Sequence, residues 1–458
     1  MASSTTDNGR ANFGSRLGIV LATAGSAVGL GNVWRFPYMT GQNGGALFLI
    51  VYLGCVLLLG IPCMVSEFII GRRAQANTAR AYTKMAGGGP WSAVGFLGVL
   101  TGFLITGYYA VVSGWCLQYI FASLMGHLKG DAAYITDYFT QFVCHPWKPI
   151  VWMLVFFAIT HTVIVCGVEK GIERASKLLM PTLFVLLLII VVASCLLPGA
   201  GEGIRFLFMP DVTKMNSSLF LNALGQSFYS LSLAMGCICT YASYFSRHTN
   251  LMQSALHICI VDSFVAILAG LMIFPAAFSV GVSPDSGASL VFITLPNVFQ
   301  QAFAAMPAVG YVIGLAFYAL LALAALTSLM SLHEVSTAFF HEELHIRRRW
   351  GALIVTLSCA AIGCLCSLSF SQPELSLWGM SLFDLFDFVT GQIFLPVGGF
   401  LTCLFLGWVV PRRVVADEFT NGGTLHVRPI LLRAYLFSVR YVCPICIALV
   451  FLHQLGAI

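Results

Sequence analysis

Glycines, an asparagine and an arginine interrupt an apolar segment near the N-terminus. Residues 24–38 read AGSAVGLGNVWRFPY, with Gly29, Gly31, Asn32 and Arg35 inside a run long enough to cross a membrane. Lipid tolerates broken backbone only where that backbone faces protein or a water-filled cavity. A helix that breaks at mid-membrane exposes carbonyl groups for a cation and N–H groups for a carboxylate, as in secondary transporters. These residues predict an ion-coupled transporter of a small anionic or zwitterionic solute.

Two further polar interruptions occur later in the chain. Residues 225–236 read GQSFYSLSLAMG, which is rich in small and hydroxyl residues and has glycine at both ends. Transporter repeats place irregular helices at matching positions, so a sixth span that breaks as the first does would fit two five-span repeats. Thr327 and Ser328 are adjacent hydroxyls in a run made mostly of Ala and Leu. The alternative for these two is a hydrogen bond back to the preceding helical turn.

The composition is that of a membrane protein. Of 458 residues, 59% are apolar and 9% are charged, whereas soluble domains have about 25% charged residues. The net charge of +5 comes from basic residues scattered among loops, so we expect no nucleic-acid partner. Nearly all of the 15 cysteines lie in apolar runs, which does not resemble a disulfide framework.

One cysteine pair has the spacing of a redox or zinc motif. Cys443-Pro-Ile-Cys446 lies inside an apolar segment, and no second pair of the same spacing accompanies it. We therefore interpret the two thiols as core packing rather than as a metal or redox site.

Runs of about 20 apolar residues, the length that crosses a bilayer, predict an all-α integral membrane protein with eleven spans. Seventeen Lys and Arg residues fall in the segments that are cytoplasmic if the N-terminal segment 1–14 is inside, against four in the outer segments. This bias places the N-terminus in the cytoplasm and the C-terminus outside. The spans are predicted at about 15–39, 44–71, 89–125, 150–168, 174–197, 219–245, 253–280, 309–341, 350–369, 378–410 and 430–455.

Several separate motifs together resemble one family. GLGNVWRFPY, Tyr108-Tyr109 followed by Gly114-Trp115, GQSFYSLSLAMG followed by TYASY, and Leu326-Thr327-Ser328 are similar to motifs of the neurotransmitter:sodium symporters, in order over spans 1 to 10. The resemblance implies the LeuT fold, with two inverted five-helix repeats at 15–197 and 219–410 and one extra C-terminal helix at 430–455. Eleven spans resemble the bacterial subgroup that transports hydrophobic or aromatic amino acids.

The resemblance also implies two sodium sites and no organic cofactor. The first site would consist of the Ala27 carbonyl, Asn32, Ser230, Asp262 and the substrate carboxylate; the second would consist of the carbonyls of Gly25, Val28 and Ala324 with the hydroxyls of Thr327 and Ser328. Asp262 departs from the asparagine usual in the family. Its carboxylate would supply the negative charge that chloride supplies in animal members, so we expect chloride-independent transport. If Asp262 is protonated instead, the coupling would involve protons.

The substrate pocket implied by the resemblance surrounds the two broken helices. Its residues would be Ser26, Gly29, Leu30, Gly31, Ile105, Tyr109, Tyr229, Ser230, Ser232, Met235, Ser328 and Leu332. The carboxylate would meet the N–H groups near Leu30 and Gly31, at the positive end of a half-helix, and the Tyr109 hydroxyl. Monoamine transporters of the family carry aspartate at the position of Gly29, so glycine favours a substrate with its own carboxylate. Met235 offers an adaptable wall for a bulky apolar side chain.

Charged residues at membrane depth predict gates on both sides of this pocket. An unpaired charge there costs about 2.5–3.5 kcal/mol, so we expect Arg35 to pair with Asp387 as an outer gate, over a lid formed by Tyr109 and Tyr229. The inner gate would pair Arg10 with Glu342, near Tyr244, although both charges are equally well explained as ordinary topology signals. We expect Glu67 to be buried and to brace the unwound part of span 6.

We therefore expect a sodium-coupled symporter that imports a hydrophobic or aromatic L-amino acid by alternating access. Its location would be the bacterial inner membrane, and its partners would be the amino acid, sodium ions and the lipid bilayer. No enzyme motif is present. The alternatives are another small solute (glycine, a GABA-like amino acid or an osmolyte), a channel, or a non-transporting sensor. The sequence does not indicate the oligomeric state.

Overall fold

The computed structural model describes residues 13–281 and 290–454, and the regular structure of these residues is helical apart from one isolated bridge between Leu377 and Met380. Within them, nine helical segments are long and apolar enough to cross a membrane. They are Ala46–Ala74 (with α3, Ala46–Cys55, and α4, Ile61–Ala74), Ser92–Leu124 (α6), Lys148–Val165 (α8), Val168–Cys195 (with α9, Arg174–Cys195), Leu251–Ser279 (α13), Pro307–Glu343 (α15), Arg348–Leu368 (α16), Leu382–Val409 (with α17, Leu382–Asp387, and α18, Leu395–Leu404) and Pro429–Gln454 (with α20, Pro429–Phe437, and α21, Cys443–Gln454). Shorter helices connect them: α5 (Thr78–Ala86), α7 (Ala132–Val143), α10 (Ala200–Phe208), α14 (Leu295–Ala302) and α19 (Arg412–Phe419).

The first predicted span is broken, as expected. Helix α1 (Arg16–Ala27) meets the segment Gly31–Gln42, which ends in α2 (Phe36–Gln42), at an angle of 50°. The N–H group of Gly29 donates to the side-chain Oδ1 of Asn32 at 3.1 Å. In a continuous helix that N–H group would donate to the carbonyl of Gly25, four residues earlier. The asparagine side chain therefore takes the place of one backbone hydrogen bond of the helix at the break. The Gly25 carbonyl is left without this partner.

The sixth predicted span is broken as well. Residues 231–236 separate α11 (Ser217–Ser230) from α12 (Cys237–Ala242), and Ser232, Ala234 and Gly236 have φ angles of 53°, 64° and 78°. Non-glycine residues rarely adopt this left-handed conformation, so other contacts must hold it. The N–H group of Ala234 donates to Oε1 of Glu67 at 2.6 Å, and the Ser232 hydroxyl donates to the Ser26 carbonyl at 2.9 Å. The nine continuous segments and the first broken span account for ten of the eleven predicted spans, and α11 and α12 lie at the position of the sixth.

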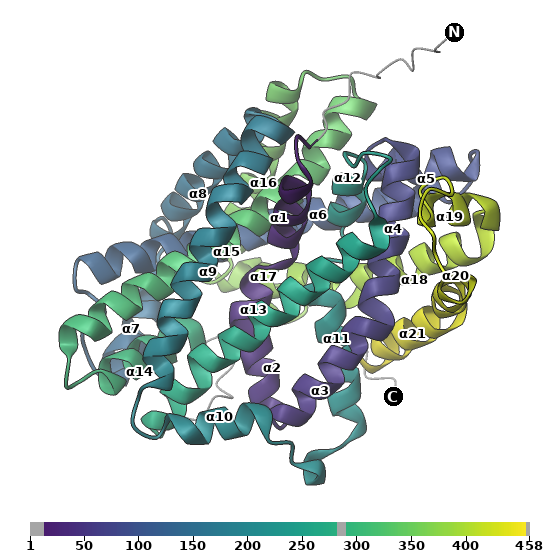
Figure 1. The fold of residues 1–458 in the computed structure, drawn as a ribbon. Helices are drawn as coiled ribbons and strands as arrows, with labels where there is room; N and C mark the ends of the chain where they lie inside the picture. Colours follow the sequence, from purple (N-terminus) through teal and green to yellow (C-terminus); the bar gives the residue numbers. More distant parts are fainter. Residues whose placement is uncertain (1–12, 282–289, 455–458) are drawn as a thin grey trace.

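The broken spans lie in the middle of the bundle. Helix α1 packs against α9, α13 and α15, and Figure 1 shows α1 and α2 in purple near the centre of the molecule. The C-terminal helices α18 to α21 (yellow-green to yellow) form one side, where α21 packs against α18 and α11. The boundaries of the two repeats, 15–197 and 219–410, and of the segments 1–14 and 430–455 stay predictions, and residues 1–12 lie outside the described chain.

Replacement of Glu67 tests the brace on span 6. Glu67→Ala leaves the buried N–H group of Ala234 without its acceptor, which costs about 1–3 kcal/mol. We expect a lower thermal unfolding midpoint for the purified protein in detergent. Glu67→Gln keeps a carbonyl oxygen that accepts the same hydrogen bond and should unfold close to wild type. Equal stability of Glu67→Ala and wild type would show that the carboxylate does not brace the break.

Candidate substrate and ion site

A small cavity of about 40 Å³ lies where the two broken spans meet. Its lining residues are Ser26, Ala27, Gly29, Gly31, Ile105, Tyr109, Tyr229, Ser230, Ser232, Met235, Ser328 and Leu332. All of the predicted substrate residues except Leu30 are among them, and Ala27, predicted for an ion site, joins them. The structure therefore brings together residues of α1, α6, α11 and α15 that are up to 306 positions apart in the chain.

A vestibule of about 300 Å³ adjoins this cavity. Both spaces are lined by Gly31, Tyr109 and Tyr229, so the two tyrosines form part of the boundary between them. The remaining vestibule residues are Leu30, Trp34, Arg35, Tyr38, Tyr108, Val112, Phe383, Asp384 and Asp387. A solute that enters from this side meets the aromatic rings before it reaches the broken backbone.

Tyr109, which lines the cavity, is hydrogen-bonded to the backbone at the break in span 1. The N–H group of Leu30 donates to the Tyr109 hydroxyl at 3.2 Å, so a backbone donor and a phenol meet at the break in span 1. A Cβ atom on Gly29 would overlap the Ser328 hydroxyl and lie 3.2 Å from the Tyr109 hydroxyl. The position therefore leaves no room for a side chain while Ser328 and Tyr109 keep their places.

The predicted first ion site is a cluster of buried oxygen-bearing side chains. Asn32 donates through Nδ2 to Asp262 Oδ1 at 2.8 Å, and the Ser230 hydroxyl donates to Asp262 Oδ2 at 2.9 Å. Tyr52, which the sequence reasoning missed, donates to the same carboxylate oxygen at 3.1 Å. Tyr52 lies in a uniformly apolar run, and no signal in the sequence marks it.

Charge balance makes this cluster unusual. Asp262 is fully buried, and among the described residues no Lys or Arg nitrogen lies within 4.0 Å of its carboxylate. Burial of a charged carboxylate without a basic partner is costly, and a bound cation or proton offsets that cost. Oxygen atoms are also the ligands that hard cations prefer. The donor set therefore fits a small hard cation such as sodium.

The residues of the predicted second ion site lie between α1 and α15. The Thr327 hydroxyl lies 3.4 Å from the Val28 carbonyl and 3.0 Å from the Ala324 carbonyl. A Cβ atom on Gly25 would lie 3.3 Å from Thr327 Cβ, so the two backbones approach closely. The neighbouring hydroxyl of Ser328 instead lies 3.4 Å from the Ser26 carbonyl and lines the cavity. The adjacent hydroxyls of α15 thus have different surroundings.

Arg35 and Asp387, predicted as the outer gate, line the same vestibule. No ion pair within 4.0 Å joins them in the described chain. The guanidinium of Arg35 lies 4.3 Å above the ring centre of Tyr229, a cation–π contact. Asp387 accepts a hydrogen bond from the Tyr108 hydroxyl at 3.1 Å. The two charges have aromatic partners here, and their direct pairing stays a prediction for the closed state.

The residues predicted for the inner gate are only partly described, because Arg10 lies outside the described residues. Glu342 accepts from the backbone N–H group of Asn77 at 2.7 Å, at the start of α5. Tyr244 donates to Oε1 of Glu334 at 2.7 Å, and Arg348 pairs with Oε2 of the same carboxylate at 2.5 Å. Glu334 is fully buried. The sequence places Arg348 among the cytoplasmic topology charges, and its partner could not be read from spacing.

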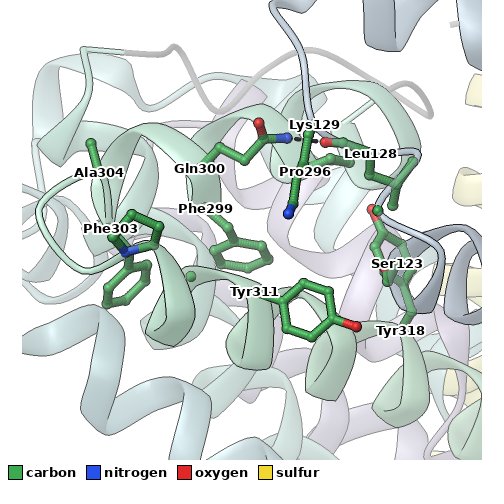
Figure 2. A pocket seen from close by; sticks show the side chains of 14 residues that line it. Ser123, Leu128, Lys129, Pro296, Phe299, Gln300, Phe303, Ala304, Tyr311 and Tyr318 are labelled. Carbon is green, nitrogen blue, oxygen red and sulfur yellow. Dashed lines mark hydrogen bonds between the residues drawn. The ribbon is translucent and has the colours of Figure 1, made fainter.

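A larger cavity of about 330 Å³ lies away from these residues, between the end of α6, helix α14 and the start of α15. Figure 2 shows its aromatic side chains, including Phe299 and Tyr311, with Lys129 beside them. The side chain of Gln300 is already hydrogen-bonded to the Leu128 carbonyl. None of the predicted site residues is among the described residues that line this cavity.

Comparisons with known proteins agree with this geometry. The model of the sodium:neurotransmitter symporter family matches residues 10–144 and 135–458. An uncharacterised sodium-dependent transporter of Bacillus subtilis, YhdH, is 36% identical over 97% of both chains. A similar protein of Haemophilus influenzae is 32% identical over 98% of this chain and 99% of its own.

A solved structure is similar over nearly the whole chain. The crystal structure of MhsT in complex with L-phenylalanine matches with a TM-score of 0.88 and 41% identity, and covers 98% of this chain and 100% of MhsT. The all-helical architecture with two broken spans is thus the LeuT fold that the motifs implied. The chain belongs to the sodium:neurotransmitter symporter family, and it is a sodium-dependent, multi-pass membrane transporter rather than an enzyme.

Proposed function

We propose that this protein imports a hydrophobic or aromatic L-amino acid together with sodium, by alternating access and without chloride. The proposal includes a location in the bacterial inner membrane with the N-terminus in the cytoplasm. The observation that carries it is the cavity between the two broken spans, whose wall includes Tyr109, hydrogen-bonded to the Leu30 N–H group, and Ser230, hydrogen-bonded to the buried Asp262 carboxylate.

The shape of the cavity supports an amino acid with an apolar side chain. Gly29 leaves no space for an aspartate that would hold an amine, so the substrate has to supply its own carboxylate. Ile105, Met235 and Leu332 form apolar walls. MhsT, at 41% identity, binds L-phenylalanine, which is the class of solute that these walls favour.

The oxygen clusters support two sodium ions. In the first site, Asp262, Asn32 and Ser230 would hold an ion beside the substrate carboxylate, with the Ala27 carbonyl as a further ligand. In the second site, the carbonyls of Gly25, Val28 and Ala324 would bind the other ion with the Thr327 hydroxyl, which already lies near two of these carbonyls. The Ser328 hydroxyl, which lies 3.4 Å from the Ser26 carbonyl here, would have to turn toward the ion to complete the site. The carboxylate of Asp262 makes chloride unnecessary, because it already supplies a fixed negative charge.

The unequal accessibility of the two sides supports alternating access. The vestibule beside Arg35 and Asp387 adjoins the cavity. On the opposite side, Tyr244 and Arg348 form a hydrogen-bonded cluster around the buried carboxylate of Glu334. Substrate would draw Arg35 toward Asp387 over Tyr109 and Tyr229, and release would require the inner cluster, with the predicted pair of Arg10 and Glu342, to open.

Uptake into proteoliposomes tests the whole proposal. Labelled amino acids, glycine, GABA and an osmolyte are offered with and without an inward sodium gradient, and with chloride replaced by gluconate. We expect accumulation of one or a few apolar amino acids that requires sodium and not chloride. Accumulation of only glycine, GABA or the osmolyte would assign another solute class. Flux without sodium would favour a channel, and no flux of any solute would favour a sensor.

Gly29→Ala tests the assigned substrate position. The added methyl overlaps Ser328, and overpacking of this kind costs about 1–3 kcal/mol. We expect the apparent KM for the amino acid to rise by about tenfold or more. Gly314→Ala is the matched control, because a Cβ atom there meets no atom within 4 Å. Wild-type KM in Gly29→Ala would place the substrate elsewhere.

Asp262→Asn tests the origin of the chloride independence. Loss of the carboxylate removes the fixed charge opposite the first ion, so the sodium concentration for half-maximal uptake should rise by about tenfold, or about 1.4 kcal/mol. Uptake by the variant should also become faster when chloride is present. Asp137→Asn, on the exposed face of α7, serves as control. Unchanged sodium and chloride dependence would remove Asp262 from the ion site.

A further inference from the structure

Three cysteine thiols converge far from the substrate cavity. Cys63 of α4, Cys403 of α18 and Cys443 of α21 have their Sγ atoms within 4.8 Å of one another, and those of Cys63 and Cys403 are 3.6 Å apart. All three side chains are buried. The residues come from three different spans and are up to 380 positions apart. The described residues contain no other group of three metal-ligating side chains as compact as this one.

The spacing of the sulfur atoms fits a single metal ion. A metal–sulfur bond is about 2.3 Å long, so three sulfur atoms around one ion in a plane lie about 4.0 Å apart. The observed separations, from 3.6 Å to below 4.8 Å, bracket that value. Small rotations of the thiols would bring all three to bonding distance without moving the helices.

The donor set selects a soft ion. Thiolate sulfur favours Cu⁺, Zn²⁺ and iron–sulfur clusters over hard cations. Structural zinc is almost always bound by four ligands, and the compact group here supplies three. Cys446, the other half of the Cys-Pro-Ile-Cys motif, does not belong to the group. A three-sulfur group to which no fourth His, Cys, Asp or Glu of the described residues belongs therefore favours Cu⁺.

Binding of Cu⁺ is coupled to loss of protons from the thiols. The thiolate, and not the thiol, is the metal ligand, so each sulfur atom that bonds the ion releases its proton to the buffer, and Cu⁺ balances one of the resulting negative charges. The carbonyl of Leu58 lies 3.9 Å from the Cys443 sulfur, and the Leu58 side chain is 63% exposed, so the site is close to the outer surface of the bundle.

We propose that Cys63, Cys403 and Cys443 form a binding site for one soft monovalent d10 metal ion of the Cu⁺ class. The ion would add a link between three spans that are already joined by packing and by hydrogen bonds such as those of Ser66 with Tyr435 and of Ser438 with the Leu58 carbonyl. The site shares no residue with the amino acid or sodium sites, so it is independent of the proposed transport function.

Anaerobic titration of the full-length protein in detergent with Cu⁺ tests this assignment, with X-ray absorption at the copper edge as the readout. We expect one ion per chain with three sulfur neighbours. Cys63→Ser, Cys403→Ser and Cys443→Ser should each weaken binding by at least tenfold. Cys446→Ser and Cys366→Ser, which alter cysteines outside the group, should bind as wild type does.

The wild-type measurement alone can overturn the proposal, even if a serine variant fails to fold. No stoichiometric Cu⁺ binding, or a copper ion with fewer than three sulfur neighbours, would refute the site. Tighter binding of Zn²⁺ than of Cu⁺ in a parallel titration would refute the ion class. Loss of binding in Cys446→Ser with full binding in Cys403→Ser would refute the three-cysteine site and assign the ion to the Cys443-Pro-Ile-Cys446 motif.

Discussion

The central constraint on this protein is that the backbone of a broken helix in a membrane must find hydrogen-bond partners within the protein. Asn32 accepts from the Gly29 N–H group, Glu67 accepts from the Ala234 N–H group, and Ser232 donates to the Ser26 carbonyl. The last contact joins the two breaks directly. The first break is therefore stabilised by Asn32 of its own span and by Ser232 of the sixth span, and the second break is stabilised by Glu67 of the second span.

Two buried carboxylates, those of Glu334 and Asp262, differ in the groups that balance their charge. Glu334 has a basic partner in Arg348 and a phenol donor in Tyr244, so its charge is neutralised within the protein. Asp262 receives hydrogen bonds only from neutral groups in the described chain, and its charge requires a mobile cation or a proton. The first arrangement resembles a structural ion pair, whereas the second suits an exchangeable ion.

The sequence was sufficient to predict the architecture and most of the residues that line the cavity, because glycines and polar residues in apolar runs mark broken spans. The break at residues 231–236 was predictable from its small residues and from the position of the sixth span. Tyr52 and the pair of Glu334 and Arg348 could not be predicted, since their roles depend on helices that meet only in three dimensions. The same limit applies to the cysteines. Cys443 has a conspicuous neighbour in Cys446, yet its closest sulfur atoms come from α4 and α18.

The missing side chain at Gly29 also constrains how the site can diverge. Ser328 occupies the space that any larger residue at position 29 would need. A side chain at position 29, such as an aspartate that accepts amines, would require the Ser328 hydroxyl to turn away or to be lost. Positions 29 and 328 are therefore coupled, and the solutes that descendants of this protein can recognise depend on both residues.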